Sequence, residues 1–388
     1  MQAEQLHQQN KPKYARYMGL ASGIVSGILL VAIAYIWYVN YITPSHLYPG
    51  EIRVTTGSDA KAVLDRYAAP TADGSQPIYI PTGIFIESVE FKGPYTIAAS
   101  GYIWQHYADT LPQGLTHGVV LPEAESSTFT KVYETHQGSE TLVGWAFKAT
   151  LRQELDYGDY PLDRQQLWLQ MWHPDFEKDV YLLPDIPAYP EIEPTALPGI
   201  DDDFVIENWQ VEQSFFSYRL NTYNANFGLQ GWDPNQVTPE LYFNLSIKRG
   251  LFSPLISRMV VPLVILLQLF VIVLVIGTDD KRLSQFGVRP GAVIFTCAAF
   301  FFAVLVAQNS LRDEVKSHGM VYLESVHLLT YFVILGVAVN SVLLVAQPDL
   351  ALFRDNDNMW VEVAYWPLIL FVFFMITLLV FGLGAGAA

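Results

Sequence analysis

Five stretches of the chain are apolar and long enough to cross a membrane as helices. They are residues 17–39, 257–277, 290–309, 320–347 and 361–383. An α-helix rises 1.5 Å per residue, so a hydrocarbon core of ~30 Å needs about 20 apolar residues. The pattern therefore predicts one membrane helix, a long gap, and then four further membrane helices.

The gap between the first and second apolar stretches has a different pattern. Apolar and polar residues alternate there with period two, which is typical of half-buried β-strands. The predicted strands are residues 84–91, 96–107, 129–134, 141–155, 165–172, 204–219 and 240–249. Eight to ten short strands with turn signals at this spacing favour an antiparallel sandwich. A short helix is expected within residues 58–69, capped by Ser58 or Asp59.

The charges near the first helix predict its orientation. Lys11, Lys13 and Arg16 precede it, and no basic residue lies in the dozen or so positions after it. The positive-inside rule then places the N-terminus in the cytoplasm and the β-domain outside a cell (inner) membrane. A cleaved signal peptide is the alternative, but the apolar stretch exceeds the usual 7–15 residues and no small-x-small site follows it.

Composition narrows the class of protein. The chain of 388 residues is 51% hydrophobic and 15% charged. Residues 41–250 hold 28 Asp and Glu against 12 Lys and Arg, a balance of −16 that equals the net charge of the whole chain. Such an acidic segment attracts cations and does not favour nucleic acid. Cys297 is the only cysteine, so no intrachain disulfide is possible.

The chain carries no recognisable enzyme motif. It contains no HExxH, GxSxG, phosphate-binding loop or Cys/His cluster, and its eight histidines are scattered. We therefore expect neither an enzyme nor a bound cofactor or metal. Glu324 and His327, at i and i+3 in an apolar stretch, are candidates for a proton sensor or a metal pair, although an interhelical hydrogen bond is favoured.

A proline turn precedes one of the alternating strands. Residues 160–165 read Tyr-Pro-Leu-Asp-Arg-Gln. They resemble the aromatic-Pro-aromatic-Asp-x-Gln turn of the pentameric ligand-gated ion channels, or Cys-loop receptors, in their prokaryotic form; Leu162 replaces the second aromatic residue. Gln153 and Leu167 stand where animal receptors have cysteines. Further matches follow in the family's order at 101–104, 208–209, 248–249 and Pro262.

The resemblance covers residues from about 78 to the C-terminus and divides the chain into five parts. Residues 1–16 are a cytoplasmic N-terminus, 17–40 an additional transmembrane helix, 41–77 a linker, 78–250 a ligand-binding β-sandwich and 251–388 a four-helix pore domain. The additional helix is foreign to the family's plan of four helices. We expect it to tether or pack outside the pore bundle.

The resemblance implies a homo-pentamer in a lipid bilayer, opened by a small-molecule or ion agonist to let permeant ions pass. In the family, the proline turn presses on the short loop after the second pore-domain helix, here residues 311–319. Asp163 would pair with Arg249 or Lys248. Coupling roles would then fall on Lys92, Pro94, Tyr160, Pro161, Asp163, Arg249 and Arg312.

Helical spacing in residues 290–309 selects one of two pore-lining faces. The first is Pro290, Ile294, Cys297, Phe301, Val304 and Gln308; the second is Gly291, Phe295, Ala298, Phe302, Leu305 and Asn309. Either face would make a hydrophobic constriction that gates by dewetting. The family usually has Ser or Thr where Pro290 and Gly291 stand. Cations are favoured as the permeant ions, although acidic and basic residues both lie in 279–289.

The resemblance places the agonist site between subunits. The principal face would use Trp172, Tyr218, Tyr223, Phe227 and Trp232, and the complementary face Trp104 and His106. Aromatic faces attract ammonium groups through cation–π interaction, but the same rings also suit a sandwich core. A non-conducting pentameric sensor that signals through a partner, and an assembly factor with unrelated helices, are the alternative functions.

Overall fold

The computed structural model describes residues 2–43, 48–67, 77–229, 236–276, 290–315, 319–346 and 358–382. These residues form two compact units. The helical unit draws on residues 1–44, 157–163 and 251–388, and the β unit on 45–156 and 164–250. Residues 157–163 therefore belong to the helical unit, although strands of the β unit flank them on both sides.

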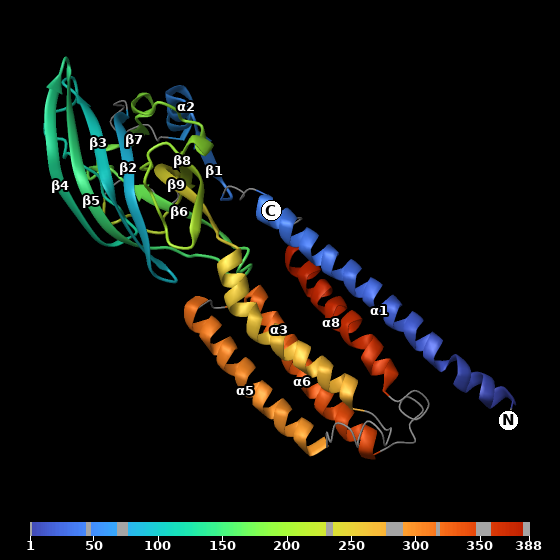
Figure 1. The fold of residues 1–388 in the computed structure, drawn as a ribbon. Helices are drawn as coiled ribbons and strands as arrows, with labels where there is room; N and C mark the ends of the chain where they lie inside the picture. Colours follow the sequence, from blue (N-terminus) through green and yellow to red (C-terminus); the bar gives the residue numbers. More distant parts are fainter. Residues whose placement is uncertain are drawn as a thin grey trace. The chain divides into compact units, whose positions relative to one another are not determined.

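The described residues of the helical unit include five long helices (Figure 1). They are α1 (Gln2–Ile42), α3 (Phe252–Val275), α5 (Pro290–Val315), α6 (Tyr322–Ala346) and α8 (Met359–Thr377), which continues as the short π-helix η4 (Leu378–Gly382). Each contains an apolar segment long enough to cross a membrane. The chain is thus a multi-pass membrane protein, and the five spans predicted from hydropathy are confirmed.

The helices pack around a core shared by α3, α5, α6 and α8. Leu269 of α3, Cys297 and Val304 of α5, Val337 of α6 and Ile369 of α8 all belong to it. The helix α1 lies along α8, on the side of the unit away from α5 (Figure 1). The Oγ of Ser22 donates a hydrogen bond to the carbonyl oxygen of Val363 (2.6 Å). The additional helix is therefore joined to the unit mainly through α8.

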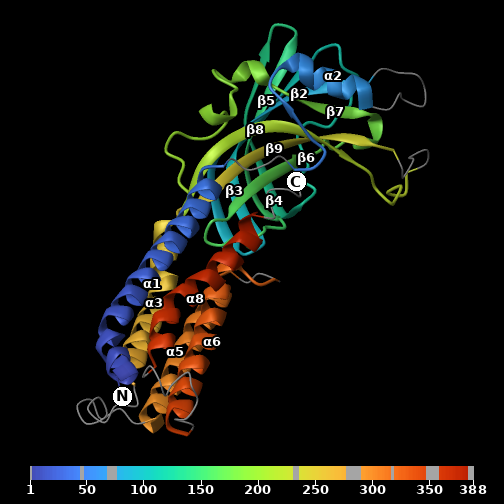
Figure 2. The same cartoon turned by 90° about the vertical axis from the view of Figure 1, so that its right-hand side faces the viewer.

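The described residues of the β unit form two sheets. One has the order β1-β8-β9-β6 and the other β4-β5-β3-β2-β7. The strands are β1 (Glu51–Val54), β2 (Ile78–Gly93), β3 (Thr96–Ala108), β4 (Ala124–Gln137), β5 (Glu140–Arg152), β6 (Arg164–Met171), β7 (Val180–Pro184), β8 (Trp209–Asn221) and β9 (Thr238–Arg249). Figure 2 shows β8 and β9 side by side, with β6 beyond β9. The Oη of Tyr218 on β8 donates to the carbonyl oxygen of Leu182 on β7 (2.8 Å), which links the sheets.

The burial of alternate residues explains why most strands were predictable. In β3, Ile103, Gln105 and Tyr107 are buried, while Trp104 and His106 on the other face are partly exposed. In β9, by contrast, every residue from Pro239 to Ile247 is buried, so both faces of this central strand are covered. Polar residues of β9 therefore need partners inside the protein.

Three features differ from the sequence predictions. The strand β1 lies within residues expected to be a linker, where it pairs with β8. β7 runs parallel to β2, whereas a fully antiparallel arrangement was expected, because β7 enters the sheet at its edge after crossing from β6. The predicted short helix is present as α2 (Gly57–Tyr67), but the backbone N–H of Asp59 bonds to Oγ1 of Thr56 (3.1 Å), so neither Ser58 nor Asp59 caps it.

Candidate functional site

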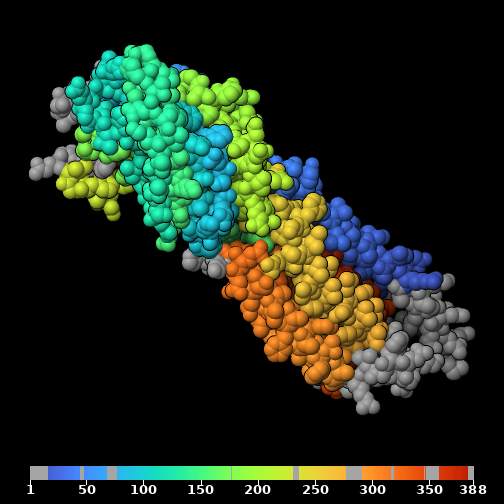
Figure 3. Space-filling model, turned by 60° about the vertical axis from the view of Figure 1, so that its left-hand side comes forward, coloured from blue at the N-terminus to red at the C-terminus, as the bar shows by residue number. Residues whose placement is uncertain are grey.

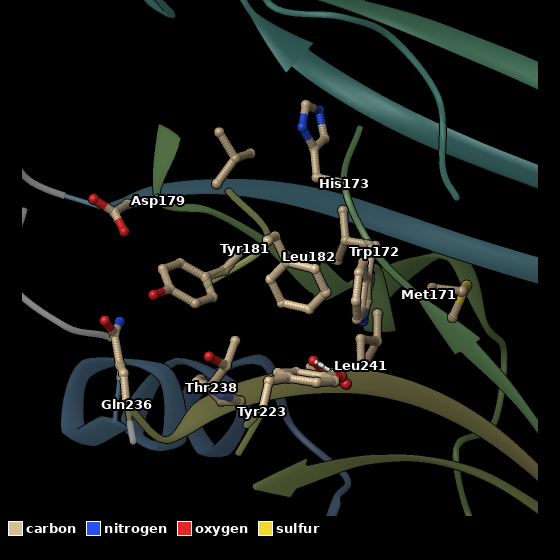
Figure 4. Close-up of a pocket in the computed structure, with 14 residues that line it drawn as sticks. Met171, Trp172, His173, Asp179, Tyr181, Leu182, Tyr223, Gln236, Thr238 and Leu241 are labelled. Carbon is tan, nitrogen blue, oxygen red and sulfur yellow. Dashed lines mark hydrogen bonds between the residues drawn. The ribbon is translucent and has the colours of Figure 1, made fainter. Parts of the chain in front are cut away.

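Four aromatic side chains, Trp172, Tyr181, Tyr223 and Phe227, line a small pocket in the β unit (Figure 4). Trp172 follows β6, and Tyr223 and Phe227 follow β8. The ring of Trp172 is nearly perpendicular to that of Tyr223 (87°, centroids 5.6 Å apart) and to that of Phe227 (84°, 6.3 Å). The cavity volume is about 50 Å³. The rings therefore present several π surfaces to a space that suits a few heavy atoms.

Glu240, at the start of β9, lines the same pocket and is only 5% exposed. Its carboxylate accepts hydrogen bonds from Oη of Tyr223 (2.7 Å), Nδ2 of Asn221 (2.5 Å) and the amide of Gln170. Burial, and then the bond to Glu240, raise the pKa of Tyr223 well above its usual value, so the phenol remains a donor. Among the described residues, no lysine or arginine pairs with Glu240 or lines the pocket. We call Glu240, Trp172, Tyr223 and Phe227 the Glu240 pocket.

His173 also lines this cavity and is 1% exposed. The backbone N–H of Asp175 donates to its Nδ1 (3.1 Å), which places the proton of the neutral ring on Nε2. Burial lowers the pKa of His173 to about 4, and the nearby carboxylate of Asp175 opposes this shift only in part. The imidazole is therefore neutral at pH 7. Sequence reasoning missed both His173 and Glu240, because neither stands in a recognisable motif.

A second aromatic group on the same sheet surrounds a cation that the chain itself supplies. The guanidinium carbon of Arg219 lies 4.5 Å from the ring centroid of Tyr48, 4.7 Å from Trp168 and 4.4 Å from Tyr242. Its Nε lies 3.4 Å from the buried carboxylate of Glu51. We call Arg219, Glu51, Tyr48, Trp168 and Tyr242 the Arg219 cluster. It combines cation–π attraction with a buried ion pair.

The other predicted ligand residues lie apart from the pocket. Tyr218 is fully buried and bonds to β7, so it belongs to the core. The Nε1 of Trp104 donates to Asp185 (2.8 Å), and its ring lies against Gly83. His106 lies between Glu140 (2.9 Å) and Asp185 (3.2 Å). Trp104 and His106 share the more exposed face of β3. Trp232 falls outside the described residues.

The proline turn, residues 157–163, packs against the helices of its own unit. Tyr160, whose peptide bond to Pro161 is cis, is fully buried. The backbone N–H of Tyr322, at the start of α6, donates to the carbonyl oxygen of Gly158 (2.8 Å). The Oη of Tyr160 lies 3.3 Å from the carboxylate of Glu314 near the end of α5. The turn thus contacts both helices that flank the α5–α6 connection.

Charged residues at these helix ends are paired. Glu314 also accepts a bond from Arg258 of α3, which donates to Oγ of Ser310 as well (2.8 Å). Arg312 bonds to Glu324, whose carboxylate is buried at the start of α6. Residues 311–315 were expected to lie in a loop, but α5 extends to Val315. Sequence reasoning expected the turn to press on residues 311–319, which include Glu314, but it singled out neither Glu314 nor Tyr322.

The remaining predicted coupling residues lie in the β unit. Lys92 lies near the end of β2, where it pairs with Glu90 (2.5 Å), and Pro94 is in the β2–β3 turn. Arg249 lies over the ring of Trp209 (4.1 Å). Lys248 pairs with Glu212 (3.3 Å). The ion pair of Asp163 with Arg249 or Lys248 stays a prediction.

Tyr322 also joins α1 to the start of α6. The Nε1 of Trp37 on α1 donates to the Oη of Tyr322 (2.9 Å), and the same oxygen lies 2.8 Å from Oγ1 of Thr377 on α8. The ring of Trp37 meets that of Phe373 edge to face (centroids 6.2 Å apart). Three helices therefore meet at the residue whose backbone holds the proline turn.

The two predicted faces of α5 differ in burial. On the first face, Cys297 and Val304 are buried in the core of the helical unit, and Gln308 accepts a bond from Tyr331 (3.0 Å). On the second face, Phe295 is 79% and Phe302 64% exposed. Gly291, Ala298, Leu305 and Asn309 of that face are exposed too. In the space-filling view α5, in light orange, lies at the surface of the helical unit (Figure 3).

The remaining members of the first face are intermediate cases. Ile294 is 46% and Phe301 44% exposed, and Phe301 packs against Tyr331 of α6 (ring centroids 4.9 Å apart). The structure does not describe the side chain of Pro290. The first face is therefore largely engaged within one chain, whereas the second is not.

Glu324 and His327 are both buried, but they bond to different groups. Glu324 accepts from Arg312 and from the backbone N–H of Val321 (3.3 Å), while Nδ1 of His327 lies 3.2 Å from the carbonyl oxygen of Leu323. Across the described ranges, no group of three or more His, Cys, Asp or Glu side chains is placed to hold a metal ion.

Comparison with known proteins does not assign the chain to a family. No protein-family model matches it, and no curated protein matches it significantly. The functional argument therefore rests on the sites described above.

Proposed function

We propose that this protein is the subunit of a homo-pentameric ligand-gated ion channel. In this proposal the β unit is an extracytoplasmic sandwich that binds the agonist at subunit interfaces, and α5 lines a central pore. The observation that carries the proposal is the packing of residues 157–163 with the helices, while β5 and β6 hold both ends of this turn.

The proposed mechanism is mechanical coupling through this turn. A shift of β5 or β6 moves the turn because the chain is continuous. The turn contacts α6 through the bond from Tyr322 to Gly158, and α5 through Tyr160 and Glu314. Because buried Tyr160 has no room to absorb such a shift, the ends of α5 and α6 move with it.

The Glu240 pocket supports a small organic cation as the agonist. The Arg219 cluster demonstrates that aromatic rings and a buried carboxylate on this sheet hold a guanidinium. The Glu240 pocket offers the same two kinds of group, without a basic side chain from the described residues. Cation–π attraction of ~1–2 kcal/mol per desolvated contact and the charge of Glu240 would both favour an ammonium group. The volume of about 50 Å³ favours a small alkylammonium ion.

The second face of α5 supports the pore assignment. Phe295 and Phe302 are large, apolar and exposed in a single chain. Five copies of this face around an axis would enclose a hydrophobic constriction that opens and closes by wetting. The acidic β unit would raise the local concentration of cations at the pore entrance.

In this proposal α1 lies outside the pore bundle and steadies the coupling junction. Its contact with Tyr322 through Trp37 supports that role. The change Trp37→Phe keeps an aromatic ring but removes the donor, so we expect a several-fold shift in the agonist concentration needed for opening. Tyr38→Phe, on the exposed side of α1, is the matched control. An unchanged concentration dependence in Trp37→Phe would exclude the role.

The test of the proposal combines imaging with recording. Electron microscopy of the purified protein should show a five-fold ring, and Phe302→Ser should give leak current in planar bilayers because it makes the constriction polar. Ala303→Ser is the control, since Ala303 is exposed but lies about 100° around the helix from Phe302, off the proposed pore face. A particle without five-fold symmetry, or equal silence from Phe302→Ser and Phe295→Ser together, would contradict the channel. A silent five-fold ring that binds the cation would favour the sensor.

A further inference from the structure

A groove of about 720 Å³ runs between α6 and α8 in the helical unit. Leu329 and Gly336 of α6 and Trp360, Leu368 and Val372 of α8 are among its lining residues. The groove therefore has an apolar wall on each helix. Its volume is in the range that holds a drug-sized molecule.

One lining residue, Asn340 of α6, is polar, and its side-chain amide N–H group has no acceptor among the described residues. Asn340 is 7% exposed, and its Nδ2 has no hydrogen-bond acceptor in the described part of the chain. Tyr365, another lining residue that can donate, bonds to the carbonyl oxygen of Leu266 (2.7 Å). A buried amide N–H without an acceptor is unfavourable. The groove therefore favours an occupant that is apolar along its length and carries an acceptor near Asn340.

The depth of Asn340 in the membrane identifies the acceptor. Asn340 lies four residues before the end of the apolar span Tyr322–Leu344, or about 6 Å along the helix. Trp360 is the second residue of the span Met359–Gly382, and tryptophan favours the edge of the hydrocarbon layer. The ester carbonyl oxygens of glycerophospholipids lie at that edge, with the acyl chains extending inward.

The length of the groove fits such a chain. From Asn340 to Leu329 the helix rises about 16 Å, and from Trp360 to Val372 about 18 Å. Both distances run from the edge of the hydrocarbon layer toward its middle and beyond. The two walls thus follow the direction in which an acyl chain extends.

We propose that this groove binds one acyl chain of a membrane glycerophospholipid, whose ester carbonyl oxygen accepts a hydrogen bond from Nδ2 of Asn340. The apolar walls take up the chain, and Asn340 distinguishes an ester from an ether at its head. This site is independent of the pore and of the Glu240 pocket.

The experiment compares two lipids with the same head group. Purified full-length protein in detergent is equilibrated with diacyl phosphatidylglycerol, which has ester carbonyls, or with dialkyl phosphatidylglycerol, which has ether oxygens. Native mass spectrometry then measures the lipid retained per subunit. We expect the wild type to prefer the diacyl lipid by about three- to tenfold, which is the effect of one hydrogen bond.

Two variants test the two parts of the site. Asn340→Leu should abolish the preference while the chain-binding walls remain. Gly336→Leu should lower retention of both lipids, because a Cβ at Gly336 meets no heavy atom within 4 Å and the added side chain enters the groove without displacing the fold. Val339→Leu, on an exposed position of α6 that does not line the groove, is the control.

The outcomes separate clearly. Loss of the preference in Asn340→Leu, together with lower retention in Gly336→Leu, supports the site. A wild type that retains both lipids equally, or a preference that persists in Asn340→Leu, overturns the role of the amide. Full retention in Gly336→Leu overturns the groove as the binding place.

Discussion

Two groups of aromatic side chains on the four-stranded sheet each surround a buried carboxylate, and they differ in where the cation comes from. In the Arg219 cluster, Glu51 and three rings hold the chain's own guanidinium. In the Glu240 pocket the carboxylate accepts only neutral donors from the described residues. The first arrangement stabilises the fold. In the second, the aromatic rings and the buried carboxylate are available to bind a cation from solution.

The two carboxylates are also held differently. Glu51 is bonded by Ser217 (2.6 Å) and Gln166 (2.9 Å) in addition to Arg219, so its charge is balanced within the sheet. Glu240 has three neutral donors and no ion pair among the described residues, because Arg219, which lies opposite it in the β8–β9 register, is paired with Glu51. The comparison therefore predicts that changes in the first group act on stability and changes in the second act on binding.

The largest effect is expected from Glu51→Gln. This change leaves Arg219 buried among rings without its carboxylate, so the free energy of unfolding should fall by about 3 kcal/mol. Chemical denaturation followed by tryptophan fluorescence measures it. A decrease of less than ~1 kcal/mol would mean that the Arg219 cluster does not stabilise the fold. The contrast with the Glu240 pocket would then fail.

Glu240→Gln should act on binding instead. Loss of the charge should weaken binding of a small alkylammonium ion about 30-fold, or about 2 kcal/mol, while the free energy of unfolding changes by less than ~1 kcal/mol. Titration calorimetry with methylammonium and tetramethylammonium measures the affinity. Equal affinities of wild type and Glu240→Gln would remove the proposed cation site.

Lowering the pH should destabilise the region of the Glu240 pocket before that of the Arg219 cluster. The pKa of His173 is lowered to about 4 by burial, so below its unfolded value of ~6.5 the unfolded state binds the extra proton. Stability is therefore lost as pH falls from about 6.5 to 4, by on the order of 2 kcal/mol after allowance for solvent screening. Hydrogen exchange at pH 4.5 and 7 should show the loss at residues 172–181 and not at β1.

The change His173→Gln provides the control for this pH effect. It removes the titrating ring, so the added exchange at low pH should disappear. An acid-induced loss of the same size in His173→Gln would assign the effect to another group.

The smallest effect is expected from single hydroxyl groups. Tyr223→Phe removes one donor to Glu240 and should weaken alkylammonium binding about fivefold, or about 1 kcal/mol. Tyr48→Phe keeps the ring over Arg219 and should leave binding within twofold. Equal changes from both would mean that the two groups are not functionally distinct.

The sequence predicts the elements of this protein better than their arrangement. The five helices follow from the length of each apolar stretch, and β3 follows from strict alternation. β1 has only four residues, too few for a period to be visible. In β9 the sequence still alternates, with apolar residues at every second position from 241 to 247, so it predicts the strand but not the burial of both its faces.

The candidate site is predicted only in part for a similar reason. Trp172, Tyr223 and Phe227 were expected to lie together and do, whereas Tyr218 points into the core. The aromatic composition of the segment cannot assign these rings to faces, because the backbone leaves the β8 ladder after Asn221. Glu240 is one acidic residue among many, and only the fold brings it beside residues some 15 to 70 positions away.

Helix faces are a further limit. Spacing alone gives two possible pore-lining faces of α5, because two apolar sets of residues with the same helical spacing are offset by one position. Packing of Cys297 and Val304 against α3 and α6 distinguishes them, and that packing depends on contacts distant in sequence.

The central claim is that binding in the β unit opens a pore through residues 157–163, and current recording tests it most directly. Purified protein in planar bilayers should open in a concentration-dependent manner with a small alkylammonium ion. Tyr160→Phe should reduce opening while calorimetric binding stays unchanged, because it removes the contact with Glu314. Cation binding without current in both the wild type and Phe302→Ser would contradict the account. So would full opening in Tyr160→Phe.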